Sequence, residues 1–390
     1  MKYDFDTPVN RFNTWSSKWD GSAARYKPGF IPMFVADMDL NCAPQIVAAL
    51  HKAADHGIYG YTMPPKEYFE AVQRWFKVRY NWAIETDWIL PSAGTCSGIN
   101  MAFEAFSNIG DGIIITRPVY GHFTGMIEGD THRKAVDVHL HLDENNVWRM
   151  DFDEIEKACS DSHNRIFLLC SPHNPVGRVW EEWELRKIIE ITKKYNVLLI
   201  VDEIHCDLIR KDKKFVSVGT LTDDYSNIII AGGLGKTFNI AGLHASNIII
   251  PDKFLRERFR QTAGFGMSTP FTIAAVISAY TECDDWVDEL NEYLDGNVDT
   301  AMTFFAEKMP WVKVSRPEGT YCLWLDFEAS GLSGEEIHRR IYDEANVILQ
   351  DGKGHDPEFG ACCQRMCVPT ARSVLKEALE RIAAQFTDIK

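Results

Sequence analysis

The sequence predicts an α/β protein with a large lobe built on a mainly parallel sheet and a smaller α+β lobe at the C-terminal end. Short apolar runs alternate with helix-length amphipathic stretches over residues 46–285. The runs are continuous rather than alternating, as in strands that are buried on both faces of a covered sheet. Residues 286–390 change to one long helical stretch, short strands and a closing helix, which is typical of a second unit.

The expected elements of the large lobe follow one another in a regular order. Helical periodicity covers 44–55 and 66–80, and a third helix is expected from the turn at 94–98 to residue 106. The predicted strands are the apolar runs at 112–116, 165–170, 197–201, 227–230 and 246–250, with an amphipathic helix at 181–195. Strands that alternate with helices in this way form a sheet with helices on its faces.

The C-terminal part predicts a lobe of its own. A long helix is expected at 286–308, strands at 311–314 and 321–327, and a closing helix at 373–386. A chain of 390 residues is also longer than one ordinary core serves. We therefore expect an N-terminal arm over residues 1–45 that packs with the small lobe, a large lobe over 46–285 and a small lobe over 286–390.

The composition restricts the possible partners. The net charge is −15, which argues against nucleic acid or an anionic membrane surface as a partner. No apolar stretch approaches the roughly 18 residues that span a bilayer, and the first residues lack a signal-peptide pattern. The ten cysteines are scattered, without metal-ligand spacing. We expect a cytoplasmic protein with reduced thiols and no metal.

A lysine follows a glycine-rich turn directly after a predicted strand, in the sequence Gly232-Gly233-Leu234-Gly235-Lys236-Thr237. Glycines allow backbone N–H groups to approach an anion closely, and a lysine there can bind phosphate or form a Schiff base. The nucleotide-binding pattern GxxxxGK[ST] fails, because its first glycine would fall at Ile230. A surface lysine after a turn is the alternative.

Two further polar residues follow predicted strands. Asp202 comes at the strand end where α/β sheets place their ligands. Its carboxylate can pair with a protonated pyridine nitrogen and keep the ring an electron sink; an acidic turn, or a metal site with His205 and Asp207, is the alternative. Asn174 lies in the rigid turn at 171–177. It can donate to a phenolate oxygen, or it is a simple turn asparagine.

An anion site and a buried cation complete the candidates. Gly94, Thr95 and Cys96 precede a predicted helix, whose N–H groups and dipole favour an anion, unless they are an ordinary helix start. Arg365 lies in an apolar, cysteine-rich run. A buried arginine needs an anionic partner, which is either an internal acid or the carboxylate of a small substrate.

Taken in order, these motifs resemble a known family. The chain resembles the fold-type I pyridoxal-phosphate enzymes of the class I/II aminotransferase superfamily, and most of all their MalY/PatB-like branch of cystathionine β-lyases, or C–S lyases. The matching segments run nearly end to end, at 10–20, 35–39, 59–62, 171–177, 202–205, 236–239, 319–321 and 324–326. The resemblance implies a large α/β/α domain and a smaller α+β C-terminal domain.

The resemblance also implies a pyridoxal 5'-phosphate cofactor and its ring site. Lys236 would hold the cofactor as a Schiff base and shuttle protons, and Asp202 would pair with the pyridine nitrogen. Asn174 would lie near the 3-oxygen of the ring, with His205 close by. Tyr120 would stack on the ring face.

The remaining candidates are assigned to the phosphate and the substrate. Gly94, Thr95 and Cys96 would hold the phosphate, and Arg365 would bind the substrate α-carboxylate. Tyr61 would reach the cofactor phosphate of the neighbouring subunit, so the resemblance implies a homodimer with shared active sites.

The sequence departs from the branch at several positions. Gly235 stands where a serine usually precedes the lysine, and Gly233 replaces another frequent hydroxyl. Gly121 follows the ring tyrosine in place of an aromatic residue, and Cys367 replaces a common asparagine. His244 occupies a position of glutamine in the branch and of arginine in the wider superfamily. We expect His244 to replace a lost phosphate ligand, with packing beside the next strand as the alternative.

The resemblance implies an enzyme that acts on small amino acids. The favoured outcome is α,β-elimination, in which Lys236 removes the α-proton and a thiol leaves from the β-carbon, giving pyruvate and ammonia. Transamination with a 2-oxo acid is the alternative, because the same residues serve both reactions. A regulatory binding protein of the same fold is the second alternative, since some proteins of the branch bind transcription regulators. The presence of Lys236, Asp202, Asn174 and Arg365 argues against an inactive relative.

Overall fold

Seven strands form the larger sheet in the order β2-β10-β9-β8-β7-β3-β4. The structure is a computed structural model that describes residues 1–263 and 268–389. The strands β9, β8, β7, β3 and β4 run parallel, whereas β10 is antiparallel to both β9 and β2. Their bounds are β2 Ile89–Ser92, β3 Gly112–Arg117, β4 Lys134–His139, β7 Asn164–Cys170, β8 Leu198–Asp202, β9 Ile228–Gly233 and β10 Ser246–Ile249.

The central strands are buried on both faces, as the continuous apolar runs predict. Alternate residues of β8 enter opposite cores, because successive side chains of a strand point to opposite faces. Leu199 and Val201 belong to one hydrophobic cluster, while Leu198 and Ile200 belong to the other. Neither face of this strand therefore meets solvent.

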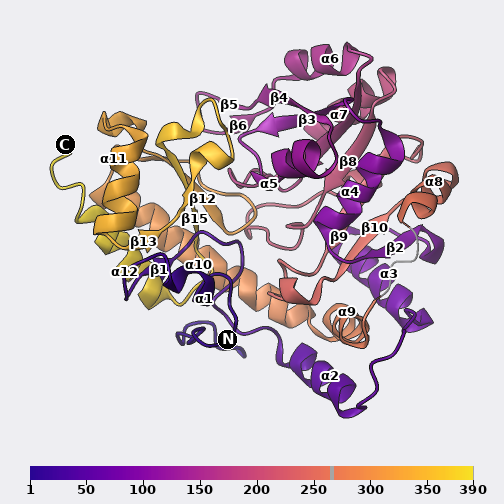
Figure 1. Ribbon diagram of the computed structural model, residues 1–390, viewed down its shortest axis with the longest axis horizontal. Helices are drawn as coiled ribbons and strands as arrows, with labels where there is room; N and C mark the ends of the chain where they lie inside the picture. The colour runs from indigo at the N-terminus through magenta and orange to yellow at the C-terminus, as the bar shows by residue number, and fades with distance from the viewer. Residues whose placement is uncertain (264–267, 390) are drawn as a thin grey trace.

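Helices cover the two faces of the larger sheet (Figure 1). On one face lie α3 Lys66–Tyr80, α6 Phe152–Ser160, α7 Glu182–Lys194 and α9 Pro270–Glu282, with α2 Pro44–Asp55 packed on α9. On the other face lie α4 Thr95–Phe106, α8 Lys253–Ala263 and the segment of α5 His122–Thr124 and η2 Gly125–Asp130. The helices and strands expected for this lobe are confirmed to within a few residues at their ends.

The C-terminal part is built on a four-stranded antiparallel sheet in the order β11-β12-β15-β14. Its strands are β11 Lys313–Val314, β12 Cys322–Asp326, β14 Gln350–Asp351 and β15 Cys363–Cys367, and its helices are α10 Asp284–Lys308, α11 Gly334–His338 and α12 Arg372–Ala383. The predicted strand at 311–314 is shorter than expected, because Trp311 and Val312 lie in a turn. The α/β fold class is therefore confirmed.

The N-terminal arm lies against this C-terminal part (Figure 1). Its strand β1, Ile31–Pro32, pairs in parallel with β13, Val347–Ile348, and α1 covers Asp20–Ala23. A small hairpin of β5 His141–Leu142 and β6 Trp148–Arg149 completes the strands. The predicted domain boundaries at residues 45 and 285 stay a proposal. No helix within the described ranges combines the length and the apolar character needed to cross a membrane.

Candidate active site

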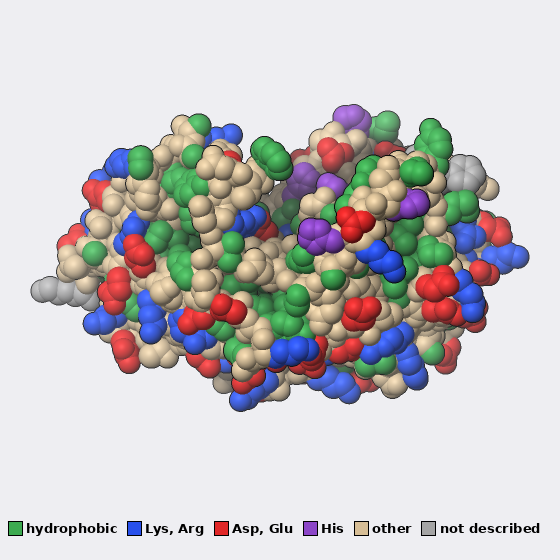
Figure 2. Space-filling model, turned by 90° about the horizontal axis from the view of Figure 1, so that it is seen from below, with side chains coloured by type: hydrophobic (Ala, Val, Ile, Leu, Met, Phe, Trp, Pro, Cys, Tyr) green, Lys and Arg blue, Asp and Glu red, His purple; other side chains and the backbone are tan. Residues whose placement is uncertain are grey.

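A cavity of about 250 Å³ lies at the carboxyl ends of the parallel strands β7, β8 and β9. All predicted site residues except Tyr61 and Arg365 line it: Gly94, Thr95, Cys96, Tyr120, Asn174, Asp202, His205, Lys236 and His244. Strand ends of this kind are where α/β sheets place their ligands. In the space-filling view the surface is hollowed between the two lobes, with histidine side chains on one wall (Figure 2). The topology thus brings together residues that are far apart in the sequence.

Lys236 follows the end of β9, and its side chain is largely withdrawn from water. Its Nζ donates a hydrogen bond of 2.6 Å to the carbonyl oxygen of Ala36. The hydroxyl of Tyr321 donates to the same carbonyl at 2.9 Å. Burial, followed by the positive charge of Arg365, lowers the pKa of Lys236. A neutral amine is the form that attacks a carbonyl carbon or removes a proton.

Asp202 ends β8 and is 5% exposed. Burial raises the pKa of its carboxyl to about 7, against the opposing effects of the Ile204 N–H at 3.1 Å and of Lys236. A buried carboxyl group with so little compensation is suited to a cationic partner, which would bring its pKa down again. The buried environment of Asp202 is therefore suited to a protonated ring nitrogen.

His205 is almost fully buried, and burial lowers its pKa well below the usual value. Its Nδ1 has no hydrogen-bond partner within the described part of the chain. Buried polar atoms in native proteins are nearly always paired. This nitrogen belongs to a residue that lines the cavity, so it would be available to a polar group of a bound molecule.

Arg365 lies on β15 and reaches the cavity through Asn174. Its Nη1 donates to Asn174 Oδ1 at 3.2 Å, and its Nη2 donates to the carbonyl oxygen of Phe34 at 2.6 Å. The side chain is 2% exposed, its Nε is unpaired, and no described carboxylate lies within ion-pair distance. The arrangement favours an incoming carboxylate over an internal acid as the partner of this arginine.

The opposite end of the cavity has the features of an anion site. Helix α4 begins at Thr95, and its cap Gly94 has φ +114°, a conformation that favours glycine. The Thr95 hydroxyl lies 3.0 Å from Ser246 Oγ, and Ser97 also lines the cavity. His244 has left-handed backbone angles and joins the same wall. A helix start and a histidine therefore meet where a phosphate would bind.

Tyr120 supplies an aromatic wall. Burial raises the pKa of its phenol to about 12, so the ring is neutral at physiological pH. The cavity therefore combines an aromatic wall, an anion-binding helix start, a buried carboxyl group and a buried amine. These features fit a planar cationic ring that carries an aldehyde and a phosphate, which is the chemistry of pyridoxal phosphate.

Tyr61 does not line the cavity. It lies between α2 and α3 and is 93% exposed, as are large parts of Ile58, Tyr59 and Met63. A contiguous exposed apolar stretch of this kind is typical of an interaction surface. The predicted role of Tyr61 across a dimer interface stays a proposal.

Asp207, which the alternative metal site would need, has other partners. Its carboxylate accepts hydrogen bonds from Thr237 Oγ1 at 2.8 Å and from Trp75 Nε1 at 3.1 Å, and also from Tyr80. Thr237 is the neighbour of Lys236, so Asp207 helps to fix the lysine turn. Among residues 1–263 and 268–389, no group of three or more metal-binding side chains is present.

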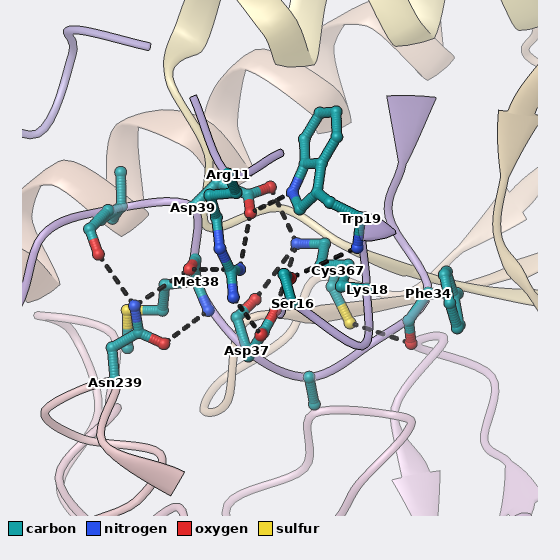
Figure 3. A network of polar contacts seen from close by, with 12 residues as sticks. Arg11, Ser16, Lys18, Trp19, Phe34, Asp37, Met38, Asp39, Asn239 and Cys367 are labelled. Carbon is teal, nitrogen blue, oxygen red and sulfur yellow. Dashed lines mark hydrogen bonds and ion pairs between the residues drawn. The ribbon is translucent and has the colours of Figure 1, made fainter. Parts of the chain in front are cut away.

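A polar network that the sequence motifs did not reveal holds the N-terminal arm against the lysine turn (Figure 3). The Asp39 carboxylate accepts from Arg11 and Trp19 at 2.9 Å and from Lys18 at 2.8 Å. Asn239 Nδ2 donates to the Met38 carbonyl at 2.9 Å. The network fixes the segment that contains Ala36, whose carbonyl accepts from Lys236.

The network also explains several of the matching motifs. The segments at 10–20, 35–39 and 236–239 are distant in sequence, but they meet in this one cluster. No single motif predicts the contact, because each half is an ordinary charged or polar segment. The only sequence signal for this contact was the presence of all three segments in the same chain.

Comparisons with known proteins agree with this geometry. The family model for Aminotransferase class I and II matches residues 31–382. The chain is 36% identical to cystathionine beta-lyase PatB of Bacillus subtilis over 392 residues, covering 98% of this chain and 100% of the relative.

Two solved structures are similar over almost the whole chain. Cystalysin from Treponema denticola, which contains a pyridoxal 5'-phosphate cofactor, has a TM-score of 0.95 at 35% identity and covers 100% of both chains. The pyridoxal-phosphate-bound C–S lyase from Staphylococcus hominis has a TM-score of 0.92 at 29% identity and covers 99% of both chains. The chain belongs to the class I and II aminotransferase family and has its fold-type I architecture.

Proposed function

We propose that this protein is a pyridoxal-phosphate-dependent carbon–sulfur lyase. It cleaves cystathionine- or cysteine-type amino acids by α,β-elimination to pyruvate, ammonia and a thiol. The observation that carries the proposal is the meeting of Lys236, Asp202, Asn174 and Arg365 at one cavity and its margin. Similarity to cystathionine beta-lyase PatB over nearly the full length supports it.

The chain offers a residue for each part of the cofactor. Lys236 would bind its aldehyde carbon, Asp202 its ring nitrogen and Asn174 its ring oxygen. His205 would lie beside the ring, with its unpaired nitrogen available, and Tyr120 would cover one face. When bound, the cofactor supplies an electron sink for the negative charge that develops at the substrate α-carbon.

The phosphate would lie at the start of α4. Gly94, Thr95 and Cys96 offer backbone N–H groups there, and His244 and Ser97 line the same wall. The helix dipole favours the negative charge of the phosphate. His244 would be a further donor in place of the hydroxyls that Gly233 and Gly235 lack.

The substrate is oriented by its carboxylate and deprotonated by the lysine. Arg365 would hold the carboxylate with a charge-assisted hydrogen bond, because the two groups that accept its hydrogen bonds within the chain are neutral oxygens. Lys236 then takes the α-proton on its Nζ, for which its lowered pKa is suited. Arg365 is 2% exposed and Lys236 is partly buried, so both side chains have limited contact with water.

A homodimer with shared active sites is part of the proposal. The exposed apolar stretch that includes Tyr61 is the supporting observation. Mixing Tyr61→Phe with Lys236→Ala subunits should restore one functional site per heterodimer, provided that each variant alone is severely impaired. Absence of recovery from subunits that have demonstrably exchanged would argue that each site is built within one chain.

We also propose that the protein works in the cytoplasm on small molecules, without a nucleic-acid or membrane partner. Its ten cysteines are free, as expected where thiols are kept reduced. The strongly acidic net charge of −15 is unfavourable for polyanionic partners.

Product analysis tests the reaction. The purified enzyme with added cofactor is incubated with cystathionine or cysteine, and pyruvate, ammonia and the thiol are measured in parallel. We expect the three products in equal amounts, and none from the Lys236→Ala variant. The family model favours transamination as the second candidate. If incubation with a panel of 2-oxo acids yields new amino acids without release of ammonia, the protein is an aminotransferase rather than a lyase.

A further inference from the structure

Two buried thiols face each other in the small sheet, close to the arginine of the active site. Cys322 on β12 and Cys367 on β15 are directly opposed in the antiparallel register. Their Sγ atoms are 3.7 Å apart, and the residues are 0% and 2% exposed. No role in the proposed lyase reaction accounts for this pair.

The backbone places the two residues in a non-hydrogen-bonded pair. The N–H of Cys367 donates away from Cys322, to the Met33 carbonyl at 2.8 Å, while the Val368 N–H donates to the Tyr321 carbonyl at 3.0 Å. Opposed residues of this kind have Cα atoms about 4.5 Å apart, closer than hydrogen-bonded pairs. Disulfides form at Cα separations of about 4.4–6.8 Å, so the strands can accept a cross-strand disulfide without separating.

The two thiols lie on the same face of the small sheet as the Arg365 side chain. Side chains two residues apart on one strand point to the same face, so Cys367 and Arg365 both face the side where Arg365 meets Asn174. The Phe34 carbonyl accepts a hydrogen bond from Arg365 at 2.6 Å. The same carbonyl oxygen lies 3.9 Å from Cys367 Sγ (Figure 3). A small uncharged molecule that reaches the carboxylate site therefore comes close to the pair.

The surroundings favour a thiolate at one member of the pair. The hydrogen bond from Cys322, together with the positive charges of Arg365, Lys18 and Lys236, lowers the pKa of the Cys367 thiol despite its burial. The pKa of Cys322 is raised, first by the hydrogen bond to Cys367. One thiolate beside one thiol is the arrangement found in reactive dithiols.

We propose that Cys322 and Cys367 are an oxidative modification site, at which a peroxide converts the dithiol to an intramolecular disulfide beside the substrate-carboxylate arginine. Cys367 attacks one peroxide oxygen, and the O–O bond breaks with release of water, leaving a sulfenic acid. Cys322 attacks that sulfur and displaces a second water. Two thiols and one hydrogen peroxide give one disulfide and two waters, and two electrons pass from sulfur to oxygen. This inference does not depend on the proposed lyase activity.

The test uses the reduced holoenzyme with hydrogen peroxide as the probe. After treatment the protein is alkylated under denaturing conditions, digested without reductant and analysed by mass spectrometry. We expect the loss of two alkylation sites per chain and one new cross-link between the peptides of Cys322 and Cys367, both reversed by dithiothreitol.

Matched variants isolate the pair. Cys322→Ser should leave Cys367 as a sulfenic acid that dimedone traps, and Cys367→Ser should leave Cys322 unoxidised. Cys159→Ser changes another buried cysteine, on α6, and should behave as the unsubstituted protein. Where a serine variant does not fold, the cross-link in the unsubstituted enzyme decides. Unmodified thiols, or oxidation to sulfinic or sulfonic acid without a cross-link, would overturn the proposal.

Discussion

Replacing Gly235 by serine should strengthen cofactor binding. Gly235 directly precedes Lys236 and lines the cavity, at a position where the family resemblance implies a serine. Its backbone is outside the left-handed region, so an L-residue is tolerated there. A serine hydroxyl at this position would add a donor toward the phosphate end of the cavity.

The size of the gain can be worked from the contacts. A Cβ at Gly235 would lie 3.2 Å from Ala241 Cα and 3.6 Å from its Cβ, so Ala241 must move by a few tenths of an ångström. A hydrogen bond to a charged group contributes about 1.5–3 kcal/mol, or roughly 10- to 100-fold in affinity. Gly235→Ala carries the same crowding without the hydroxyl, so the serine-to-alanine difference isolates the hydrogen bond.

Gly233 provides the contrasting position. A Cβ there would lie 2.9 Å from Ile204 Cδ1, 3.0 Å from Thr95 Oγ1 and 3.2 Å from the Ala245 carbonyl oxygen. Crowding on three sides of a buried strand should offset any gain, because overpacking typically costs about 1–3 kcal/mol. Gly233→Ser is therefore expected to bind cofactor no more tightly than the unsubstituted protein.

The assay is titration of each apo-enzyme with pyridoxal phosphate, followed by tryptophan fluorescence and by the visible absorbance of the bound cofactor. The expected order of affinity is Gly235→Ser, then the unsubstituted protein, then Gly235→Ala. Equal affinities for the serine and alanine variants would refute the reasoning. The phosphate would then lie out of reach of residue 235.

Four further changes test the site. Lys236→Ala should abolish turnover and the visible absorbance of bound cofactor while the circular dichroism spectrum is retained; near-normal turnover would disprove its role. Asp202→Asn should lower the rate at least tenfold, worth about 1.4 kcal/mol, with cofactor still bound, and a smaller loss in steady-state rates would exclude the electron-sink role. His244→Ala should weaken cofactor affinity in titrations of the apo-enzyme, because the side chain lines the phosphate end of the cavity, and an unchanged affinity would show that it only packs beside β10. Gly121→Ala places a Cβ 2.1 Å from the Gly354 carbonyl oxygen, so it should lower the thermal midpoint measured by calorimetry. An unchanged midpoint would show that the loops of Gly121 and Gly354 can move apart without cost.

The central strands and the chemistry at their ends were predictable from the sequence. Their isoleucine-rich runs are too apolar for an exposed face, and Asp202 and Lys236 follow two of them directly. The edge strand β4 was not predicted, because its residues are mostly part-exposed and include Lys134 and Asp137. The short β2 was missed as well, since it contains Pro91, which is unusual within a strand.

The sequence motifs could not predict the long-range polar contacts. Arg365 was recognised as a buried arginine, but its link to Asn174 depends on the packing of β15 against the turn after β7. The Cys322–Cys367 pair likewise appears only once the register of β12 and β15 is known. Local patterns report what a residue needs, such as an anion for an arginine, whereas the tertiary fold decides which group satisfies it.

Burial shifts the pKa values of Asp202 and Lys236, the two central ionisable groups, in opposite directions. It raises the pKa of Asp202 to about 7 and lowers that of Lys236, so both are displaced toward their neutral forms in the absence of a partner. A cationic ring nitrogen next to Asp202 would return that carboxyl to its charged form, while the pKa of Lys236 stays lowered, which favours the neutral amine that nucleophilic attack requires. Asp202 binds more protons in the folded apo-protein than in the unfolded chain. Its contribution to apo-protein stability is therefore fully present below the ordinary aspartate pKa and is lost as pH rises toward 7. A cationic ring bound in the cavity should remove this loss of stability at higher pH. Binding of the cation and the stability of the folded protein are therefore coupled through Asp202.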